Sequence, residues 1–204
     1  MKLKIYIFNS LEVPLDVLLN SKYISLLERS SFEKYKNLEV KKEKVVSSIF
    51  KNKYIGEYYL NEFGKPLSKD KYFNISHSHG YVVFIMDDVP IGIDIEKIKK
   101  AQEDLINYIS NDEEKQYIRD DASFYEIWTN KEALVKAYGT GIKSNPKDIK
   151  GLPINDKRIY EGKTYFNKTI RFNDYIISVS RQIDEDFELE IIKESIWYKT
   201  TFFH

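Results

Sequence analysis

The 204-residue sequence contains no cysteine. Disulfide bonds, thiolate zinc sites and a cysteine nucleophile are therefore excluded. The chain also has no net charge, because 32 basic residues balance 32 acidic ones, and this balance argues against bulk binding to nucleic acid or to a membrane surface. No apolar run approaches the length of a membrane span. Residues 1–9 are too short and too alternating for a signal peptide, so we expect a cytoplasmic protein.

The length suits one large domain or two small ones with a sizeable core. Apolar residues recur at helical spacing in segments 11–27, 31–60, 104–109, 112–118 and 124–138. Alternating segments predict strands at 4–8, 72–77, 81–86, 91–97, 164–172, 175–180 and 187–192. Each half therefore reads as helices followed by a small, mainly antiparallel sheet. We expect a mixed α/β (α+β) fold of two similar halves, 1–98 and 99–204.

The strand predicted at 91–97 carries two acids on one face. Isoleucines at every second position alternate with Gly92, Asp94 and Glu96. The period of two places both carboxylates on the same side, about 7 Å apart along the strand. Gly92, on that same side, leaves room for another group to approach the backbone. Two acids without an intervening base repel each other, so the pattern calls for a cation. The alternative is the ordinary solvated face of an edge strand.

The helix predicted at Phe124–Tyr138 carries charged residues in and beside its apolar stripe. Lys131 falls in the middle of the stripe, where a lysine is costly unless an anion meets it. Glu132 and Lys136 lie along the edge, one turn apart and in line with Trp128. If strand and helix converge, three carboxylates could hold a hard divalent ion while the lysines face phosphate. The alternative is a surface ion pair between Glu132 and Lys136.

Two other groups of residues have simpler interpretations. In the lysine-rich segment 31–60, basic residues from Lys34 to Lys44 alternate with Glu33, Glu39 and Glu43, and a solvated helix face is the leading interpretation for most of them. His77 and His79 share one strand face and could be metal ligands, but His204 is the one other histidine in the sequence. We therefore favour a hydrogen-bonded or phosphate-facing His77, with His79 as a turn residue.

Four ordered motifs resemble those of one known family, the surfactin-synthetase-activating type of 4'-phosphopantetheinyl transferase. They are Glu62-Phe63-Gly64-Lys65-Pro66, Phe73-Asn74-Ile75-Ser76-His77-Ser78, Ile91-Gly92-Ile93-Asp94-Ile95-Glu96, and Trp128 to Lys136 with its Lys-Glu-Ala-x-x-Lys core. The resemblance implies two similar α/β halves with coenzyme A in the cleft between them. It also implies transfer of phosphopantetheine from coenzyme A to a serine of an acyl or peptidyl carrier protein, with release of 3',5'-ADP.

The resemblance further implies roles for particular residues. Asp94, Glu96 and Glu132 would hold Mg²⁺ against the diphosphate of coenzyme A, and Lys136 would neutralise, or protonate, the departing 3',5'-ADP. The remaining contacts with phosphates of coenzyme A would come from Lys65, Ser76, His77 and Lys131, with Lys44 near the 3'-phosphate. The base that accepts the serine proton would be Glu132 or a metal-bound water. Glu113, which matches a family acid near the metal, is a second candidate.

The sequence also departs from the family pattern. His79 is inserted before Gly80. Glu28, which is acidic, and Ser31, which is uncharged, fall where the family has basic residues for the 3'-phosphate. Two other functions stay open: a Mg²⁺-dependent phosphodiester hydrolase and a non-catalytic module that binds coenzyme A or carrier protein. We expect the loop from Thr140 to Pro153 to meet the carrier, and the resemblance favours a monomer. Which carrier and pathway are served is not written in the sequence.

Overall fold

The computed structural model describes residues 2–141 and 145–194. In this part of the chain the helices are η1 (Ser10–Glu12), α1 (Leu15–Leu19), α2 (Leu26–Ser31), η2 (Phe32–Lys34), α3 (Leu38–Tyr54), α4 (Glu103–Ile109), α5 (Asp112–Tyr117), α6 (Asp121–Tyr138) and η3 (Pro146–Asp148). The strands are β1 (Lys2–Asn9), β2 (Tyr59–Leu60), β3 (Pro66–Leu67), β4 (Tyr72–Ser78), β5 (Tyr81–Asp87), β6 (Ile91–Lys97), β7 (Lys157–Tyr160), β8 (Lys163–Phe172), β9 (Tyr175–Arg181) and β10 (Glu188–Lys193).

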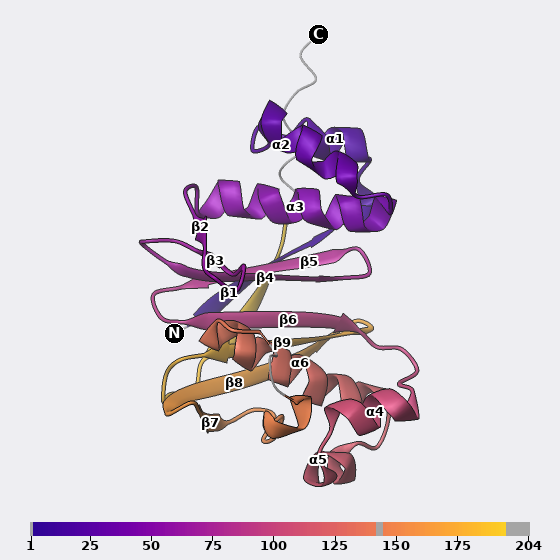
Figure 1. The fold of residues 1–204 in the computed structure, drawn as a ribbon, viewed down its shortest axis with the longest axis vertical. Helices are drawn as coiled ribbons and strands as arrows, with labels where there is room; N and C mark the ends of the chain where they lie inside the picture. Colours follow the sequence, from indigo (N-terminus) through magenta and orange to yellow (C-terminus); the bar gives the residue numbers. More distant parts are fainter. Residues whose placement is uncertain (1, 142–144, 195–204) are drawn as a thin grey trace.

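Two four-stranded sheets lie face to face in the middle of the molecule (Figure 1). The first has the order β10-β1-β5-β4 and the second the order β6-β9-β8-β7, with β2 and β3 forming a separate short hairpin. Neighbouring strands are antiparallel apart from β1 and β10, which run parallel. Helix α3 covers the outer face of the first sheet, and α6 covers the outer face of the second (Figure 1). The mixed α/β class with mainly antiparallel sheets is confirmed.

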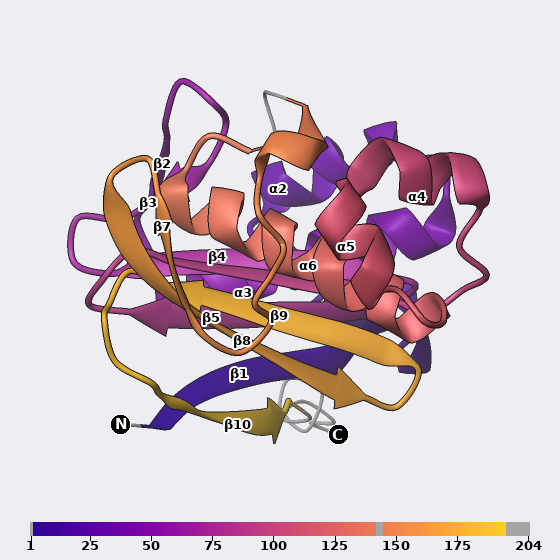
Figure 2. The same ribbon diagram turned by 90° about the horizontal axis from the view of Figure 1, so that it is seen from below.

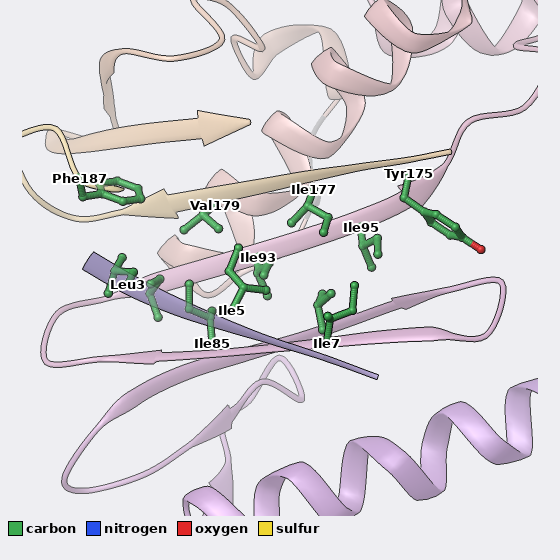
Figure 3. Close-up of a cluster of buried hydrophobic side chains, with 12 residues drawn as sticks. Leu3, Ile5, Ile7, Ile85, Ile93, Ile95, Tyr175, Ile177, Val179 and Phe187 are labelled. Atoms are coloured by element: carbon green, nitrogen blue, oxygen red, sulfur yellow. The ribbon is translucent and has the colours of Figure 1, made fainter. Parts of the chain in front are cut away.

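The main core fills the space between the two sheets. Figure 3 shows Ile5 and Ile7 of β1 together with Ile93 of β6 and Ile177 and Val179 of β9 in this space, and all five side chains are buried. The alternation predicted for residues 91–97 therefore sends its isoleucines inward between the sheets. Gly92, Asp94 and Glu96 consequently face the opposite side of β6, where α6 packs. An Ala side chain at Gly92 would have its Cβ 2.1 Å from the Ala133 carbonyl oxygen, so only glycine allows this close approach.

The strands cross the boundary predicted between the two halves. Strand β6, from the first half, hydrogen-bonds to β9 in the second sheet. Strand β10, from the second half, hydrogen-bonds to β1 at the edge of the first sheet, and Figure 2 shows these two strands side by side. The division into 1–98 and 99–204 stays a prediction, and the hydrogen bonding between strands connects the two segments.

The structure corrects several predicted element boundaries. The helix expected over 31–60 is shorter, because Asn37 caps the start of α3 and Gly56, at φ +78°, follows its end. The segment 11–27 contains two short helices, η1 and α1, and the start of α2, which Ser25 and Glu28 cap reciprocally. Strand β7 was not predicted. Among the described residues, no helix combines the length and the apolar character that crossing a bilayer requires.

Candidate active site

The candidate site lies where the edge strands β4 and β6 of the two sheets meet. Side chains at every second position of β4 bond to β6. Ser76 Oγ donates to Asp94 at 2.8 Å, and Ser78 Oγ donates to Glu96 at 2.9 Å. Asn74 accepts the backbone N–H of Ile93 at 3.0 Å, which satisfies a donor that an edge strand would otherwise leave open. The two predicted acids therefore lie at the junction between the sheets.

Helix α6 contributes the remaining polar groups to this junction. Its Trp128, Glu132 and Lys136 recur every four residues and so share one helix face. The Lys136 ammonium donates to Asp94 Oδ1 at 2.5 Å and to Ser76 Oγ at 3.1 Å. The helix is fixed at both ends, by a capping box between Asp120 and Ser123 and by Gly139 in the left-handed conformation. The predicted strand β6 and helix α6 therefore converge in the structure.

These side chains enclose a cavity of about 250 Å³. Its lining is formed by Ile75, Ser76, His77, Asp94, Glu96, Trp128, Glu132 and Lys136. Asp94 is buried, whereas Glu96, Glu132 and Lys136 are partly accessible. The structure thus brings together six of the residues predicted for the site: the three acids, Lys136, Ser76 and His77. The roles assigned to them stay predictions.

The three carboxylates are close enough to perturb one another. Burial, and secondly the charge of Asp94, raises the pKa of Glu96 to about 7. The same two causes raise the pKa of Glu132 above its ordinary value, although Lys136 opposes them. Lys136 is one positive charge against three acids, so a further cation would relieve the repulsion between the carboxylates.

The donor set fits a hard divalent cation. Carboxylate oxygens are the ligands that Mg²⁺ prefers. The buried Oδ2 atom of Asp94 has no hydrogen-bond partner among the described residues, and a buried polar atom of this kind calls for a ligand. Within residues 2–141 and 145–194, no group of three Asp, Glu, His or Cys side chains is arranged as a ready metal cage. Ligands beyond the protein, such as water or phosphate, are usual for Mg²⁺, so this finding is compatible with the fit.

A second cavity of about 350 Å³ adjoins the first, and the two share Ile75 and His77. Its lining combines aromatic rings, hydroxyl groups and charged groups: Glu28, Ser31, Phe32, Tyr35, Lys44, Ser47, Ser48, Lys51, Tyr58, Pro66, Ile75 and His77. Lys44, which the sequence analysis placed near a phosphate, belongs to this second cavity. An aromatic and hydroxyl-rich cavity with two lysines suits a nucleotide better than a purely apolar ligand.

Lys131 lies in the interior, and its predicted contact with phosphate is corrected. Its side chain is fully buried, and its ammonium donates to Glu114 at 2.6 Å and to the carbonyl oxygens of Ile109 and Pro146. The anion that a buried lysine requires is therefore Glu114, which also accepts the Gly151 amide at 2.6 Å. Burial lowers the pKa of Lys131, and Glu114 counteracts part of this effect.

Glu113 is also placed away from the cavity. It is exposed on α5, while its neighbour Glu114 points into the interior. The capping box of α5 joins Asn111 to Glu114, one position later than the predicted pair Ser110 and Glu113. The buried acid of this segment is therefore Glu114, and it bonds to Lys131 rather than to the carboxylate cluster.

Lys65 bonds to the end of α6 rather than lining either of the two cavities. Its ammonium donates to the carbonyl oxygens of Lys136 at 2.5 Å and of Ala137 at 3.3 Å. A cation at a helix C-terminus is favourable, because the last carbonyl groups have no partner within the helix. Burial lowers the pKa of Lys65 to about 8. Its predicted contact with phosphate stays a prediction that requires this ammonium to move.

Two residues of the site were missed or misjudged from the sequence. Trp128 lines the carboxylate cavity and hydrogen-bonds to Glu96, and its position one turn before Glu132 was the available signal. Glu43 is buried rather than solvated and contacts His77. It lies three residues before Val46 and seven before Phe50, both buried, so it continues the apolar stripe of α3. That spacing could have identified it.

The sequence of this chain is similar to those of known proteins that belong to one family. The family model of the 4'-phosphopantetheinyl transferase superfamily matches residues 90–191, which include β6 and α6. The chain is 30% identical over 139 residues to 4'-phosphopantetheinyl transferase gsp of Aneurinibacillus migulanus, covering 60% of this chain and 59% of that one. It is 39% identical over 88 residues to 4'-phosphopantetheinyl transferase psf-1 of Bacillus pumilus, covering 39% and 38%.

A third relative is 4'-phosphopantetheinyl transferase Sfp of Bacillus subtilis (strain 168), 37% identical over 90 residues, with 40% of each chain covered. The matches thus span between about two fifths and three fifths of the length of these relatives. The family model covers half of the present chain and includes Asp94, Glu96, Glu132 and Lys136. The chain belongs to the 4'-phosphopantetheinyl transferase superfamily.

Proposed function

We propose that the protein transfers the 4'-phosphopantetheine group of coenzyme A to a serine of an acyl or peptidyl carrier protein and releases 3',5'-ADP. Membership of the superfamily supports the proposal. The observation that carries it is the convergence of Asp94, Glu96, Glu132 and Lys136 on one cavity, with Asp94 Oδ2 buried and unsatisfied by the described residues. Phosphoryl transfer depends mainly on positioning and charge neutralisation, and these residues supply both.

Asp94, Glu96 and Glu132 would hold Mg²⁺ in this cavity. The bound ion supplies charge neutralisation at the diphosphate of coenzyme A. Ser76 and Ser78 hold two of the three acids by hydrogen bonds from β4, and Trp128 adds a hydrogen bond to Glu96. These bonds fix the carboxylates before a ligand arrives, so little ordering remains to be done on binding.

Lys136 would stabilise the negative charge on the leaving group, and Glu132 would accept the proton of the serine. The oxygen of the carrier serine forms the new bond to phosphorus, and the bond from phosphorus to the 5'-phosphate oxygen of 3',5'-ADP breaks. Lys136, which lines the cavity and bonds to Ser76, would donate to the departing phosphate. Glu132 is the proposed acceptor of the serine proton, since it is a carboxylate that lines the same cavity as Lys136.

The adjoining cavity would take the nucleotide part of coenzyme A. It adjoins the carboxylate cavity, with Ile75 and His77 in the lining of both, and Lys44 and Lys51 also line it. We propose that the carrier protein approaches near the loop that follows α6. Residues 142–144 of that predicted carrier surface, Thr140 to Pro153, lie outside the described residues. A monomeric state, a cytoplasmic location and the absence of nucleic-acid and membrane binding stay predictions.

The decisive experiment incubates the protein with coenzyme A, Mg²⁺ and a panel of apo-carrier proteins from fatty acid, polyketide and peptide synthesis. Intact-mass spectrometry should show one carrier gaining a phosphopantetheine group on its serine. Glu132→Gln should abolish the gain, whereas Glu185→Gln, an exposed acid on a distant loop, should retain it. A folded protein that modifies no carrier would contradict the proposal, and Mg²⁺-dependent cleavage of nucleic acid would favour the hydrolase instead.

A further inference from the structure

Glu43 is a buried acid that contacts His77 but has been given no role in the proposed reaction. It lies on α3 with 4% of its surface exposed, facing the turn between β4 and β5. One carboxylate oxygen accepts the backbone N–H of Gly80 at 2.7 Å. The other lies 3.0 Å from His77 Nδ1. Burial would raise the pKa of Glu43, but the hydrogen bonds from His77 and Gly80 outweigh it and lower the pKa.

His77 connects this carboxylate to a lysine. Its second ring nitrogen, Nε2, lies 2.8 Å from the Lys44 ammonium. An ammonium group can only donate, so Nε2 must accept, and the ring proton is then on Nδ1, where it donates to Glu43. The three side chains form one hydrogen-bonded chain, Glu43 to His77 to Lys44. The carboxylate thereby sets which nitrogen of His77 is free to hold the lysine.

The hydrogen-bonded series Glu43–His77–Lys44 lies beside both cavities, so it can affect how a ligand binds there. His77 forms the wall shared by the two cavities, and Lys44 lines the larger one. One N–H of Lys44 is directed to His77, and an ammonium has two further N–H groups to offer to an anion. Lys51, a second lysine of the larger cavity, donates to the Tyr58 hydroxyl at 3.0 Å.

Glu28, the acid of the same cavity, is already satisfied by protein groups. Its oxygens accept hydrogen bonds from Ser48, Asn52 and Ser25. These bonds hold Glu28 in place as a fixed negative charge beside the cavity. An incoming phosphate is therefore best received on the other side, at Lys44, where the ammonium is held by a neutral ring rather than by a competing carboxylate.

We propose that Glu43 is a positioning residue that acts through His77 to aim the Lys44 ammonium at a phosphate of coenzyme A in the larger cavity. The inference rests on the proposed function for the identity of the ligand. It gives His77 the additional role of holding the lysine through Nε2. Glu43→Gln replaces one acceptor oxygen by an NH₂ donor. That change removes either the Gly80 bond or the bond that fixes the Nδ1–H form of His77.

The first test reads the histidine directly and needs no ligand. Side-chain ¹⁵N–¹H spectra of the full chain distinguish the two ring forms, and the sequence contains only three histidines. His77 should be in the Nδ1–H form in the wild-type protein, and His77→Asn identifies its signals. A wild-type His77 with its proton on Nε2 would overturn the proposal, since that nitrogen could not then accept from Lys44.

The second test is a double-mutant cycle on the binding of coenzyme A with Mg²⁺, measured by calorimetry without any carrier. Glu43→Gln should weaken binding about 10-fold, the scale of one hydrogen bond involving a charged group. In the His77→Asn background the same change should add almost nothing, because Glu43 acts through His77. Glu33→Gln, an exposed acid that removes the same charge, should bind like the wild type. Weakening by Glu43→Gln that persists undiminished without His77 would overturn the proposal.

Steady-state kinetics separate this proposal from the proposed function. Glu43→Gln should raise KM for coenzyme A and leave kcat nearly unchanged, whereas a fall in kcat alone would contradict a positioning role in binding. If the wild-type protein binds coenzyme A but modifies no carrier, the transfer reaction is refuted. The double-mutant cycle on the binding of coenzyme A then still tests the role of Glu43. A wild-type protein that does not bind coenzyme A refutes both. If Glu43→Gln fails to fold, Glu43→Asp, which keeps the charge but shortens the reach, takes its place in the cycle.

Discussion

Asp94 and Lys136 are joined by an ion pair of 2.5 Å between Oδ1 and Nζ, and this contact connects β6 to the last turns of α6. The pair is partly open to solvent on the lysine side, with 26% of the Lys136 side chain exposed and 4% of the Asp94 side chain. A lysine in this position can leave the aspartate for a ligand phosphate without crossing a packed core. The same side chain can therefore stabilise the ligand-free site and contact the ligand.

Lys136→Ala should lower kcat for carrier modification by about 100-fold or more, the scale seen when one donor to a developing charge is removed. KM for coenzyme A should change less, because the donor matters most as the leaving group departs. Steady-state assays on the carrier that is modified test this. Lys100→Ala, an exposed lysine, is the matched control. A fall in kcat of less than threefold for Lys136→Ala would contradict its assigned role.

The metal-free protein should lose stability as the pH rises from about 4.5 to about 7. The pKa of Glu96 is raised from 4.5 to about 7 in the folded state, chiefly by burial. The folded state therefore holds a proton that the unfolded chain has already released, and that advantage disappears as the pH passes the folded pKa. Urea unfolding with EDTA at several pH values measures the slope. Glu96→Gln should flatten it, and an equal slope in both proteins would contradict the assignment.

Gly92→Ala should destabilise the protein by about 1–3 kcal/mol or more, since overpacking forces the backbone to shift. The added Cβ would meet the backbone of Ala133 and Ala137, so α6 must move away from β6 and carry Glu132 and Lys136 with it. Carrier modification should fall as well. Gly162→Ala has no atom within 4 Å of its Cβ but a φ of +72°, so it should cost about 1–2 kcal/mol and leave activity intact.

Lys131→Met should reduce the free energy of unfolding by about 3–5 kcal/mol, because it leaves Glu114 as an unpaired buried charge. At a temperature where the variant is folded, KM for coenzyme A should equal that of the wild type. Denaturation and steady-state kinetics on the same preparation measure both quantities. A large rise in KM without loss of stability would restore the phosphate contact that the sequence motif suggested.

Period and spacing were sufficient to predict the elements that carry the site. The alternation of Ile93 and Ile95 with Asp94 and Glu96 predicted a strand with both acids on one face, and β6 has that geometry. The apolar stripe predicted a helix that ends at Tyr138, and α6 ends there. These patterns were reliable because one face of each element packs in the apolar core and the other carries polar groups. The residue types therefore alternate with the period of the element.

Other features depend on contacts between distant segments, which spacing does not record. Lys131 required an anion, but the pattern could not say whether a ligand or Glu114, 17 positions earlier, would supply it. Glu43 was difficult to identify because lysines flank it in the sequence, while its partners His77 and Gly80 are more than 30 residues away. The pairing of β6 with β9 rather than with its neighbour β5 is likewise a long-range choice.

The return of β10 to pair with β1 has a consequence for how the protein is made. Residues 2–7 gain their outer strand only from residues 188–193, so the first sheet stays incomplete until residue 193 has been synthesised. An N-terminal fragment ending near residue 98 would expose the open edge of β1 and lack the sheet that its core packs against. The first sheet can therefore be completed only when residues from both ends of the described range are present, so its formation depends on contacts that are distant in sequence.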